Sequence, residues 1–489
     1  ALFAANIGSE HLVGLAGTGY SSGVAVGQFE VLASLILLVL AWVFVPFYLK
    51  SGVFTMPEFL ERRYSPAARW YLAIISIIGY VLTKISVTLY AGGIVFEVLV
   101  GGGFWTGALI IVLVTGVYTV LGGLRAVLYT EMIQTFMLIG GAVLVTVLGL
   151  SALGGWGVLR ATVESGFFDM WQPASHPSFP WTGILFGAPI LGVWYWCTDQ
   201  FIVQRVLSAQ GIDDARRGSI FAGYLKLLPL FLFVLPGVVA AALVRTGRLE
   251  LARPDHALPE MIRSLLPVGV RGLVVAGFLA ALMSSLAAVF NSCSTLVTLD
   301  VYRKLRPAAS ERRLVWVGKL TTLALVGLSL VWIPFMKYIS DQLYVYLQSV
   351  QAYISPPIAA VFLLGVAWKR LNSAGAMASL LTGFALGMGR LVLELNKGAL
   401  DGPLRWYAEI NFLHFAVLLF AICTIVLVAV SLVTRPEPEQ ELAGLTFATA
   451  TSATPGNVAP SRAAWRRLDV ILSILLAACV GLVWLFFTG

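Results

Sequence analysis

The sequence has few charged residues. Only 11% of its 489 residues are Asp, Glu, Lys or Arg, whereas soluble domains carry about a quarter. Together with 59% hydrophobic residues and a mean hydropathy of +0.90, this scarcity excludes a soluble globular protein. Apolar runs recur along the chain, and each can cross the ~30 Å hydrocarbon core with ~20 residues of helix. We therefore predict an all-α polytopic membrane protein that contacts the lipid bilayer.

Cysteine is also scarce. Cys197, Cys293, Cys423 and Cys479 lie far apart in or beside apolar segments, so they form neither a metal-ligand spacing nor a disulfide framework. The net charge of +8 is not gathered in a basic stripe with interleaved aromatics, which argues against nucleic-acid binding. No nucleophile–base pair or metal cluster stands out, so an enzyme is not expected.

The apolar runs predict about thirteen membrane spans. The chain begins within a predicted helix, so we expect a segment before residue 1. The predicted spans are 1–21 (broken), 26–49, 68–99, 103–122, 128–153, 180–205 (broken), 213–245, 268–299, 312–336, 340–366, 373–395, 411–433 and 468–488.

The loops between these spans differ in charge. Alternating them between two sides places 19 Lys and Arg on one side and 10 on the other. Cytoplasmic loops retain positive charge, so the loop with Glu61, Arg62 and Arg63 is predicted to be cytoplasmic, with the C-terminus outside. Segment 434–467, rich in Pro, Ala, Thr and Ser, predicts a flexible cytoplasmic linker before a peripheral last helix.

The first stretch, ALFAANIGSEHLVGLAGTGY, is apolar but interrupted at Asn6, Gly8, Ser9, Glu10 and His11. A helix that breaks within a bilayer frees backbone groups, which must then line a cavity or a ligand site. This pattern predicts a functional break near residue 8.

Three charged residues interrupt other predicted spans: Glu30, Lys84 and Lys226. An intramembrane charge costs roughly 2.5–3.5 kcal/mol, so each is expected to face a cavity or a partner. The alternative is a side chain that snorkels to the membrane surface from a helix end.

Asn6, His11 and Gln348 add neutral polar groups. Singly, each could be hydrogen-bonding glue between helices. Together they form a mixed donor and acceptor set that suits a neutral polyhydroxylated ligand.

The run WYWCTDQ, residues 194–200, combines aromatic rings with a carboxylate. Flat rings beside polar groups suit the C–H face of a sugar, whereas an interfacial aromatic belt is the alternative. Asp199 favours a second functional break.

Ser284 and Ser285 are adjacent hydroxyls in an otherwise apolar helix, LAALMSSLAAVFNSCSTL. Such hydroxyls commonly bond back to their own helix. Facing a broken helix, they could instead join freed carbonyls in an all-oxygen site for a monovalent cation.

These motifs, with TMPEFLERRY, GYLKLLPLF and YLQSVQAYISPPIAAVFLLGVAWKR, strongly resemble the sodium/glucose cotransporters of the solute–sodium symporter family over roughly residues 1–433. The resemblance implies a LeuT-type core of two inverted five-helix repeats, with helices one and six broken. The repeats are expected at 1–153 and 180–366, followed by accessory helices at 373–433, the linker at 434–467 and the final helix at 468–488.

The resemblance also implies the sites. Sugar-binding residues are expected at Asn6, His11, Phe29, Glu30, Tyr195, Trp196, Lys226 and Gln348, with Phe29 on the outer side. The coupling ion Na⁺ is expected on the carbonyls of Ala4, Ile7 and Ala281 and the hydroxyls of Ser284 and Ser285.

Four positions depart from the family pattern. Glu131 and Ala287 replace an Asp and a Thr of two-sodium members, so we expect one coupling sodium. Thr88 and Val345 replace acids near the cavity.

The resulting interpretation is sodium-coupled uptake of a glucose- or galactose-like monosaccharide across the plasma (inner) membrane by alternating access. A sodium-coupled myo-inositol or polyol symporter is an alternative, and a sugar-gated sensor or channel is a more distant one.

Overall fold

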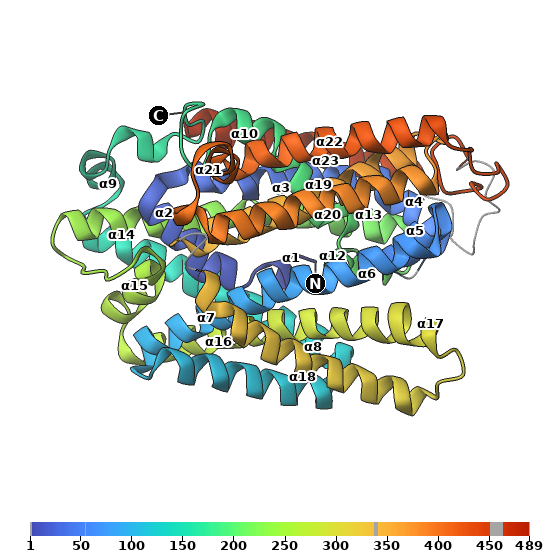
Figure 1. Cartoon of the computed structure of the whole chain (residues 1–489). Coiled ribbons are helices and arrows are strands. Elements are labelled where there is room, and N and C mark those ends of the chain that lie inside the picture. Colours follow the sequence, from blue (N-terminus) through green and yellow to red (C-terminus); the bar gives the residue numbers. More distant parts are fainter. Residues whose placement is uncertain (1, 54, 337–340, 450–462, 489) are drawn as a thin grey trace.

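The computed structural model describes residues 2–53, 55–336, 341–449 and 463–488. These residues form helices and turns, with only two isolated bridge pairs of extended backbone among them. Figure 1 shows the long helices lying roughly side by side along one axis, which confirms the predicted all-α architecture.

The α-helices follow one another in the order α1 (Leu2–Asn6), α2 (Ala16–Ser22), α3 (Gln28–Val39), α4 (Val45–Ser51), α5 (Met56–Arg63), α6 (Pro66–Tyr80), α7 (Ser86–Val95), α8 (Phe104–Leu153), α9 (Trp156–Thr162), α10 (Trp181–Phe186), α11 (Ala188–Val193), α12 (Gln200–Leu207), α13 (Ile212–Leu225), α14 (Leu235–Arg245), α15 (Ala257–Leu265), α16 (Val268–Thr295), α17 (Arg303–Leu305), α18 (Glu311–Met336), α19 (Leu343–Ala367), α20 (Ser373–Leu395), α21 (Gly402–Glu409), α22 (Phe412–Val433) and α23 (Ala463–Phe486). Short π-helical or 3₁₀ turns join several of them into longer stretches.

Ten helical stretches of the described chain are long and apolar enough to cross a membrane. One of them, Glu10–Leu49, contains most of the first predicted span and the whole of the second. The remaining predicted spans correspond to the shorter apolar helix Phe104–Val117 and to the interrupted series α10–α12. The predicted spans are therefore found in order along the chain.

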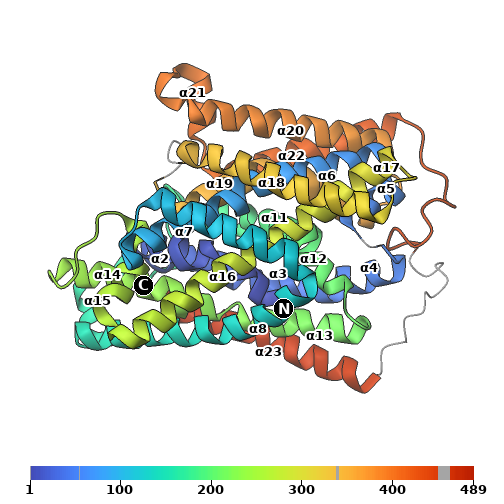
Figure 2. The same ribbon diagram turned by 90° about the horizontal axis from the view of Figure 1, so that it is seen from below.

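Helix is assigned throughout α8, Phe104–Leu153, including the loop predicted at 123–127. Both ends of α8 nevertheless lie beside the segment that follows α14. Glu97, just before α8, pairs with Arg253, and Arg248 donates a hydrogen bond to the carbonyl of Ala152. The range thus doubles back as two limbs (Figure 2).

The predicted loops lie at the two ends of the helical bundle, and consecutive loops alternate between these ends, as the two-sided assignment predicts. At one end, Arg245 pairs with Glu164 and Asn411 donates to the carbonyl of Pro177. At the other end, Lys304 pairs with Glu61, and Arg63 donates to the carbonyl of Gly365. Figure 1 shows α9 and α15 at the first end and α17 at the second.

The first part of the predicted linker is packed rather than loose. Leu442, Leu445 and Thr446 are buried, and the Phe447 amide donates to the carbonyl of Val366. Apolar side chains within an otherwise polar segment explain this packing. Residues 450–462 of the predicted linker lie outside the described residues.

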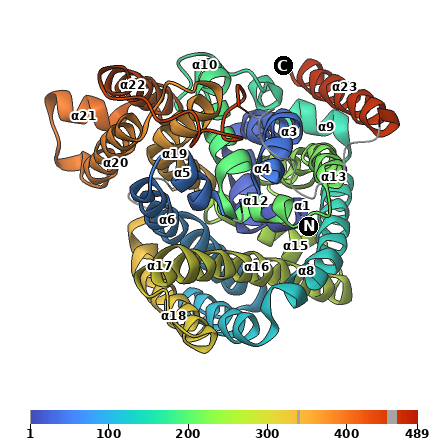
Figure 3. The same cartoon turned by 90° about the vertical axis from the view of Figure 1, so that its right-hand side faces the viewer.

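The last helix, α23, lies at the edge of the bundle against α3 and α13 (Figure 3). Asp469 on α23 is fully buried and its carboxylate lies 3.4 Å from the guanidinium of Arg216. The same helix accepts a hydrogen bond from Trp42 through Ser473 and donates one to Gln28 through Trp484. These contacts attach α23 to the two helices that lead to Glu30 and Lys226.

Candidate functional site

The first helix breaks where the sequence predicts. Helix α1 ends at Asn6, residues Ile7 and Gly8 are not helical, and a π-helical turn begins at Glu10 and continues into α2. The Gly8 position has no room for a side chain, because an added Cβ atom would lie 2.8 Å from the Ser285 hydroxyl. Because glycine has no side chain, the non-helical segment at Gly8 can approach α16 closely.

The second break lies at Asp199. The π-helical turn Trp194–Thr198 ends there, Asp199 is extended, and α12 begins at Gln200. The Asp199 carboxylate caps α12 by accepting from the amide of Phe201 at 3.1 Å, and it also accepts a hydrogen bond from Tyr80. A carboxylate at a helix N-terminus satisfies backbone amides that the break leaves without partners.

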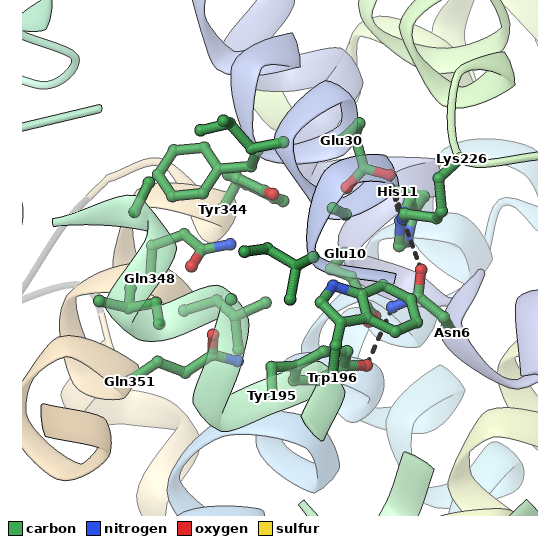
Figure 4. Close-up of a pocket in the computed structure, with 18 residues that line it drawn as sticks. Asn6, Glu10, His11, Glu30, Tyr195, Trp196, Lys226, Tyr344, Gln348 and Gln351 are labelled. Carbon is green, nitrogen blue, oxygen red and sulfur yellow. Dashed lines mark hydrogen bonds and ion pairs between the residues drawn. The ribbon is translucent and has the colours of Figure 1, made fainter. Parts of the chain in front are cut away.

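A cavity of about 60 Å³ lies between the two breaks. All eight residues predicted to bind substrate line it (Figure 4). They come from the first break, α3, the second break, the end of α13 and α19. The complete lining consists of Asn6, Glu10, His11, Phe29, Glu30, Leu32, Ala33, Ile36, Ala188, Leu191, Gly192, Tyr195, Trp196, Lys226, Tyr344, Leu347, Gln348 and Gln351.

Lys226 is the centre of a polar cluster on one wall of the cavity. Its ammonium donates to Asn6 Oδ1 at 2.6 Å, forms an ion pair with Glu30, and lies 3.3 Å from His11 Nε2. His11 Nε2 is also 3.4 Å from the Glu30 carboxylate. Lys226 and Glu30 are almost completely buried, so these groups compensate one another inside the bundle instead of snorkelling.

Tyr195 connects this cluster to a second lysine. Its hydroxyl accepts a hydrogen bond from Asn6 Nδ2 at 2.9 Å and another from Lys84 Nζ at 2.9 Å. The Lys84 ammonium also lies over the rings of Tyr195 and Phe201, at 4.2 and 4.3 Å from the ring centroids. The neighbouring Trp196 ring lies 5.4 Å from Lys226 Nζ and presents its face to the cavity wall.

Aromatic rings close the cavity beside Phe29. The Phe29 ring meets Tyr344 at 5.7 Å, Phe179 at 6.1 Å and Phe412 at 6.5 Å between centroids. Gln348 and Gln351 lie across the cavity from the Lys226 cluster, on α19 (Figure 4). Polar groups on opposite walls and rings above and below form a chamber for a ligand that is both polar and partly apolar.

The residues predicted to bind sodium lie where the first break meets α16. The Ser285 hydroxyl is 3.5 Å from the carbonyl oxygen of Ile7. The Ser284 hydroxyl is buried and has no hydrogen-bond partner among the described residues, so its oxygen is available to a ligand. Ala281 is buried one helical turn earlier on α16. Ala4 lies within α1, and its side chain is outside the described residues.

Residues 1–383 match the family model for the Sodium:solute symporter family. The chain belongs to this family. It is 40% identical to sodium/glucose cotransporter 1 of Oryctolagus cuniculus, with 90% of this chain and 73% of that protein covered. It is also 40% identical to the sodium/mannose cotransporter SLC5A10 of Bos taurus, with 94% and 84% covered.

The fold also resembles that of a solved transporter structure. A Na⁺-coupled sialic acid symporter in a substrate-bound, outward-open state covers 89% of this chain and 89% of its own, with a TM-score of 0.72 and 22% identity. This likeness, together with the two broken helices, confirms the predicted LeuT-type fold with additional C-terminal helices.

Three of the four departures from the symporter pattern can be located fully. Ala287 is buried on α16, two residues beyond Ser285. Thr88 lies on α7, with its hydroxyl 3.0 Å from that of Ser9 and within 2.7 Å of the carbonyl of Lys84. Val345 is in the first turn of α19. Glu131 lies within α8, and its side chain is outside the described residues.

Sequence reasoning assigned no role to Glu10, Tyr344 or Gln351, although all three line the cavity. Tyr344 and Gln351 lie four residues before and three residues after Gln348, so helical periodicity places them on its face of α19. That spacing was available in the sequence. The bonds of Lys84 and Asn6 to Tyr195 join residues more than 100 positions apart, and no local pattern indicates them.

Proposed function

We propose that this protein is a secondary active transporter that couples inward sodium movement to uptake of a glucose- or galactose-like monosaccharide. The observation that carries the proposal is the Lys226–Glu30–Asn6–His11 cluster, which faces two glutamines in a buried chamber with aromatic walls. The names of the relatives, which are sodium/glucose and sodium/mannose cotransporters, support a neutral sugar as the solute.

Each group of the cluster has a distinct part in sugar recognition. Glu30 accepts hydrogen bonds from sugar hydroxyls, Lys226 donates to them, and Asn6 and Gln348 can do either. Tyr195 and Trp196 pack against the C–H face of the ring. The internal bonds of Lys226 to Asn6 and Glu30 are exchanged for bonds to the sugar, which keeps the polar groups satisfied with and without the solute.

Sodium binds at the contact between the first break and α16. The carbonyls of Ala4, Ile7 and Ala281 and the hydroxyls of Ser284 and Ser285 provide oxygen ligands only, which suits a hard monovalent cation. The free Ser284 hydroxyl and the weak 3.5 Å contact of Ser285 leave both oxygens available for an ion. One sodium is moved with each sugar.

Coupling follows from the position of the break. Sodium pulls α16 onto the first helix and so favours one global arrangement, in which Asn6 and His11 on the same turn are held for the sugar. A sodium ion gains about 2.3 kcal/mol from a 100 mV potential, and a tenfold concentration gradient adds about 1.4 kcal/mol. One sodium can therefore sustain a sugar gradient of several hundredfold.

The orientation follows from the loop charges. The end of the bundle with Glu61, Arg63 and Lys304 carries the larger number of Lys and Arg and faces the cytoplasm. The described part of the linker, 434–449, lies on the same side, and α23 carries the C-terminus to the outside of the plasma (inner) membrane.

The test is uptake of labelled glucose, galactose and myo-inositol into proteoliposomes, with sodium or choline outside. Uptake of glucose or galactose that requires sodium is expected. Equal uptake in sodium and choline contradicts the coupling, whereas sodium-dependent uptake of myo-inositol alone contradicts the assigned solute.

A further inference from the structure

Glu10 lies between the sugar chamber and the sodium region. It is the first residue of the π-helical turn after the break, and it lines the cavity (Figure 4). Its carboxylate oxygen Oε2 is 3.0 Å from the position that a Cβ atom on Gly8 would occupy, and the Ser285 hydroxyl is 2.8 Å from the same point. The carboxylate and the proposed sodium-binding hydroxyl therefore approach one glycine from two sides.

The Glu10 carboxylate has no ion-pair partner within 4 Å among the described residues, unlike Glu30, which pairs with Lys226 and His11. It accepts a hydrogen bond from the Ser9 hydroxyl at 3.2 Å. The Ser9 hydroxyl in turn lies 3.0 Å from Thr88 on α7. Beyond 4 Å the charge of Glu10 interacts with those of Lys84 and Lys226. The half-buried carboxylate also faces the cavity, where a further cation can approach it.

The sodium ligands proposed above are all uncharged oxygens. Carbonyls and hydroxyls alone replace the hydration shell of an ion but leave its charge uncompensated. Glu10 is the acidic side chain of the broken helix, and its carboxylate and the Ser285 hydroxyl both lie within about 3 Å of the Cβ position on Gly8.

We propose that Glu10 is the counter-charge of the coupling cation and that its carboxylate stabilises the alkali ion bound between Ile7 and Ser285. This inference rests on the sodium coupling proposed above. Because Glu10 also lines the sugar chamber, the same carboxylate links the occupancy of the two sites. Its part is to hold the ion, while Glu30 and Lys226 hold the sugar.

The test compares Glu10→Gln with the wild-type protein and with Glu164→Gln, a matched control that neutralises an exposed carboxylate paired with Arg245. Binding of ²²Na⁺ is measured on purified protein without sugar, and sugar binding is measured at a sodium concentration that saturates each variant. E10Q is expected to weaken sodium binding at least tenfold and to change sugar binding less than threefold. E164Q is expected to change neither by more than twofold.

Sodium binding by E10Q that equals wild type overturns the proposal, as does loss of sugar binding with intact sodium binding. If E10Q does not fold, Ser9→Ala decides the question, because it removes the hydroxyl that holds the carboxylate. S9A is expected to weaken sodium binding about threefold, and unchanged binding overturns the proposal. A wild-type protein that neither binds sodium nor needs it for uptake contradicts the proposed function itself, which separates that failure from this one.

Discussion

Replacement of Lys226 by methionine tests two roles of the polar cluster, the stability of its buried ion pair and the binding of sugar. The substitution keeps most of the side-chain volume and removes the ammonium, which contacts Asn6 at 2.6 Å, Glu30, and His11 at 3.3 Å. Glu30 is then left 4% exposed, with His11, at 3.4 Å, as its one remaining ion-pair partner among the described residues. Removing one partner of a buried ion pair costs about 3–5 kcal/mol of stability.

The same substitution also removes a charged donor to the sugar. A hydrogen bond to a charged group contributes about 1.5–3 kcal/mol, so sugar binding is expected to weaken roughly ten- to hundredfold. Thermal unfolding in detergent measures the first effect, and sugar binding at saturating sodium measures the second.

A double variant tests whether the loss of stability in K226M comes from the unpaired charge of Glu30. Glu30→Gln together with Lys226→Met removes both charges, so it is expected to recover much of the stability lost in K226M. It is not expected to recover sugar binding, because the sugar has then lost both charged partners. A double variant as unstable as K226M refutes the ion-pair account, and one that binds sugar like wild type refutes the recognition account.

Three further predictions concern other parts of the molecule. Asp469→Ala leaves Arg216 without its buried partner on α23 and is expected to cost about 3 kcal/mol or more in thermal unfolding; an unchanged unfolding temperature contradicts the attachment of α23. Gly8→Ala places a methyl group 2.8 Å from the Ser285 hydroxyl, so it is expected to weaken sodium binding at least tenfold, and wild-type binding speaks against a site there. Burial raises the pKa of Asp255, outside the spans, to about 7, so the folded state holds a proton that the unfolded chain releases near pH 4. Stability is therefore expected to fall as the pH rises from about 4 to about 7, and Asp255→Asn is expected to flatten this dependence in pH-stepped unfolding.

The sequence predicted the fold at positions where a polar or helix-breaking residue stands inside an apolar, membrane-spanning segment. Gly8 and Asp199 interrupt apolar stretches, and the structure has its helix breaks at those points. Glu30 and Lys226 were expected to face a cavity or a partner, and they face both. In a bilayer each unsatisfied group is expensive, so local sequence carries more information there than in a soluble protein.

Features that depend on tertiary contacts were not predictable in the same way. The packing of Leu442 and Leu445 depends on a surface formed elsewhere in the chain. Glu10 and Ser285 are far apart in the sequence, and both lie beside Gly8 because that residue has no side chain. A polar residue at a helix break indicates a ligand site. Which residue of another helix it contacts there depends on the tertiary fold.

The gradient at which sugar flux stops tests the central claim most directly. Proteoliposomes held at zero membrane potential with a tenfold inward sodium gradient are loaded with increasing concentrations of sugar, and net flux is measured. Coupling of one sodium to one sugar predicts that net flux stops when the opposing sugar gradient is about tenfold, since the two gradients then store equal free energy, about 1.4 kcal/mol each. A balance point near hundredfold contradicts the single sodium, and a sugar flux that stops only at equal concentrations, whatever the sodium gradient, contradicts coupled transport.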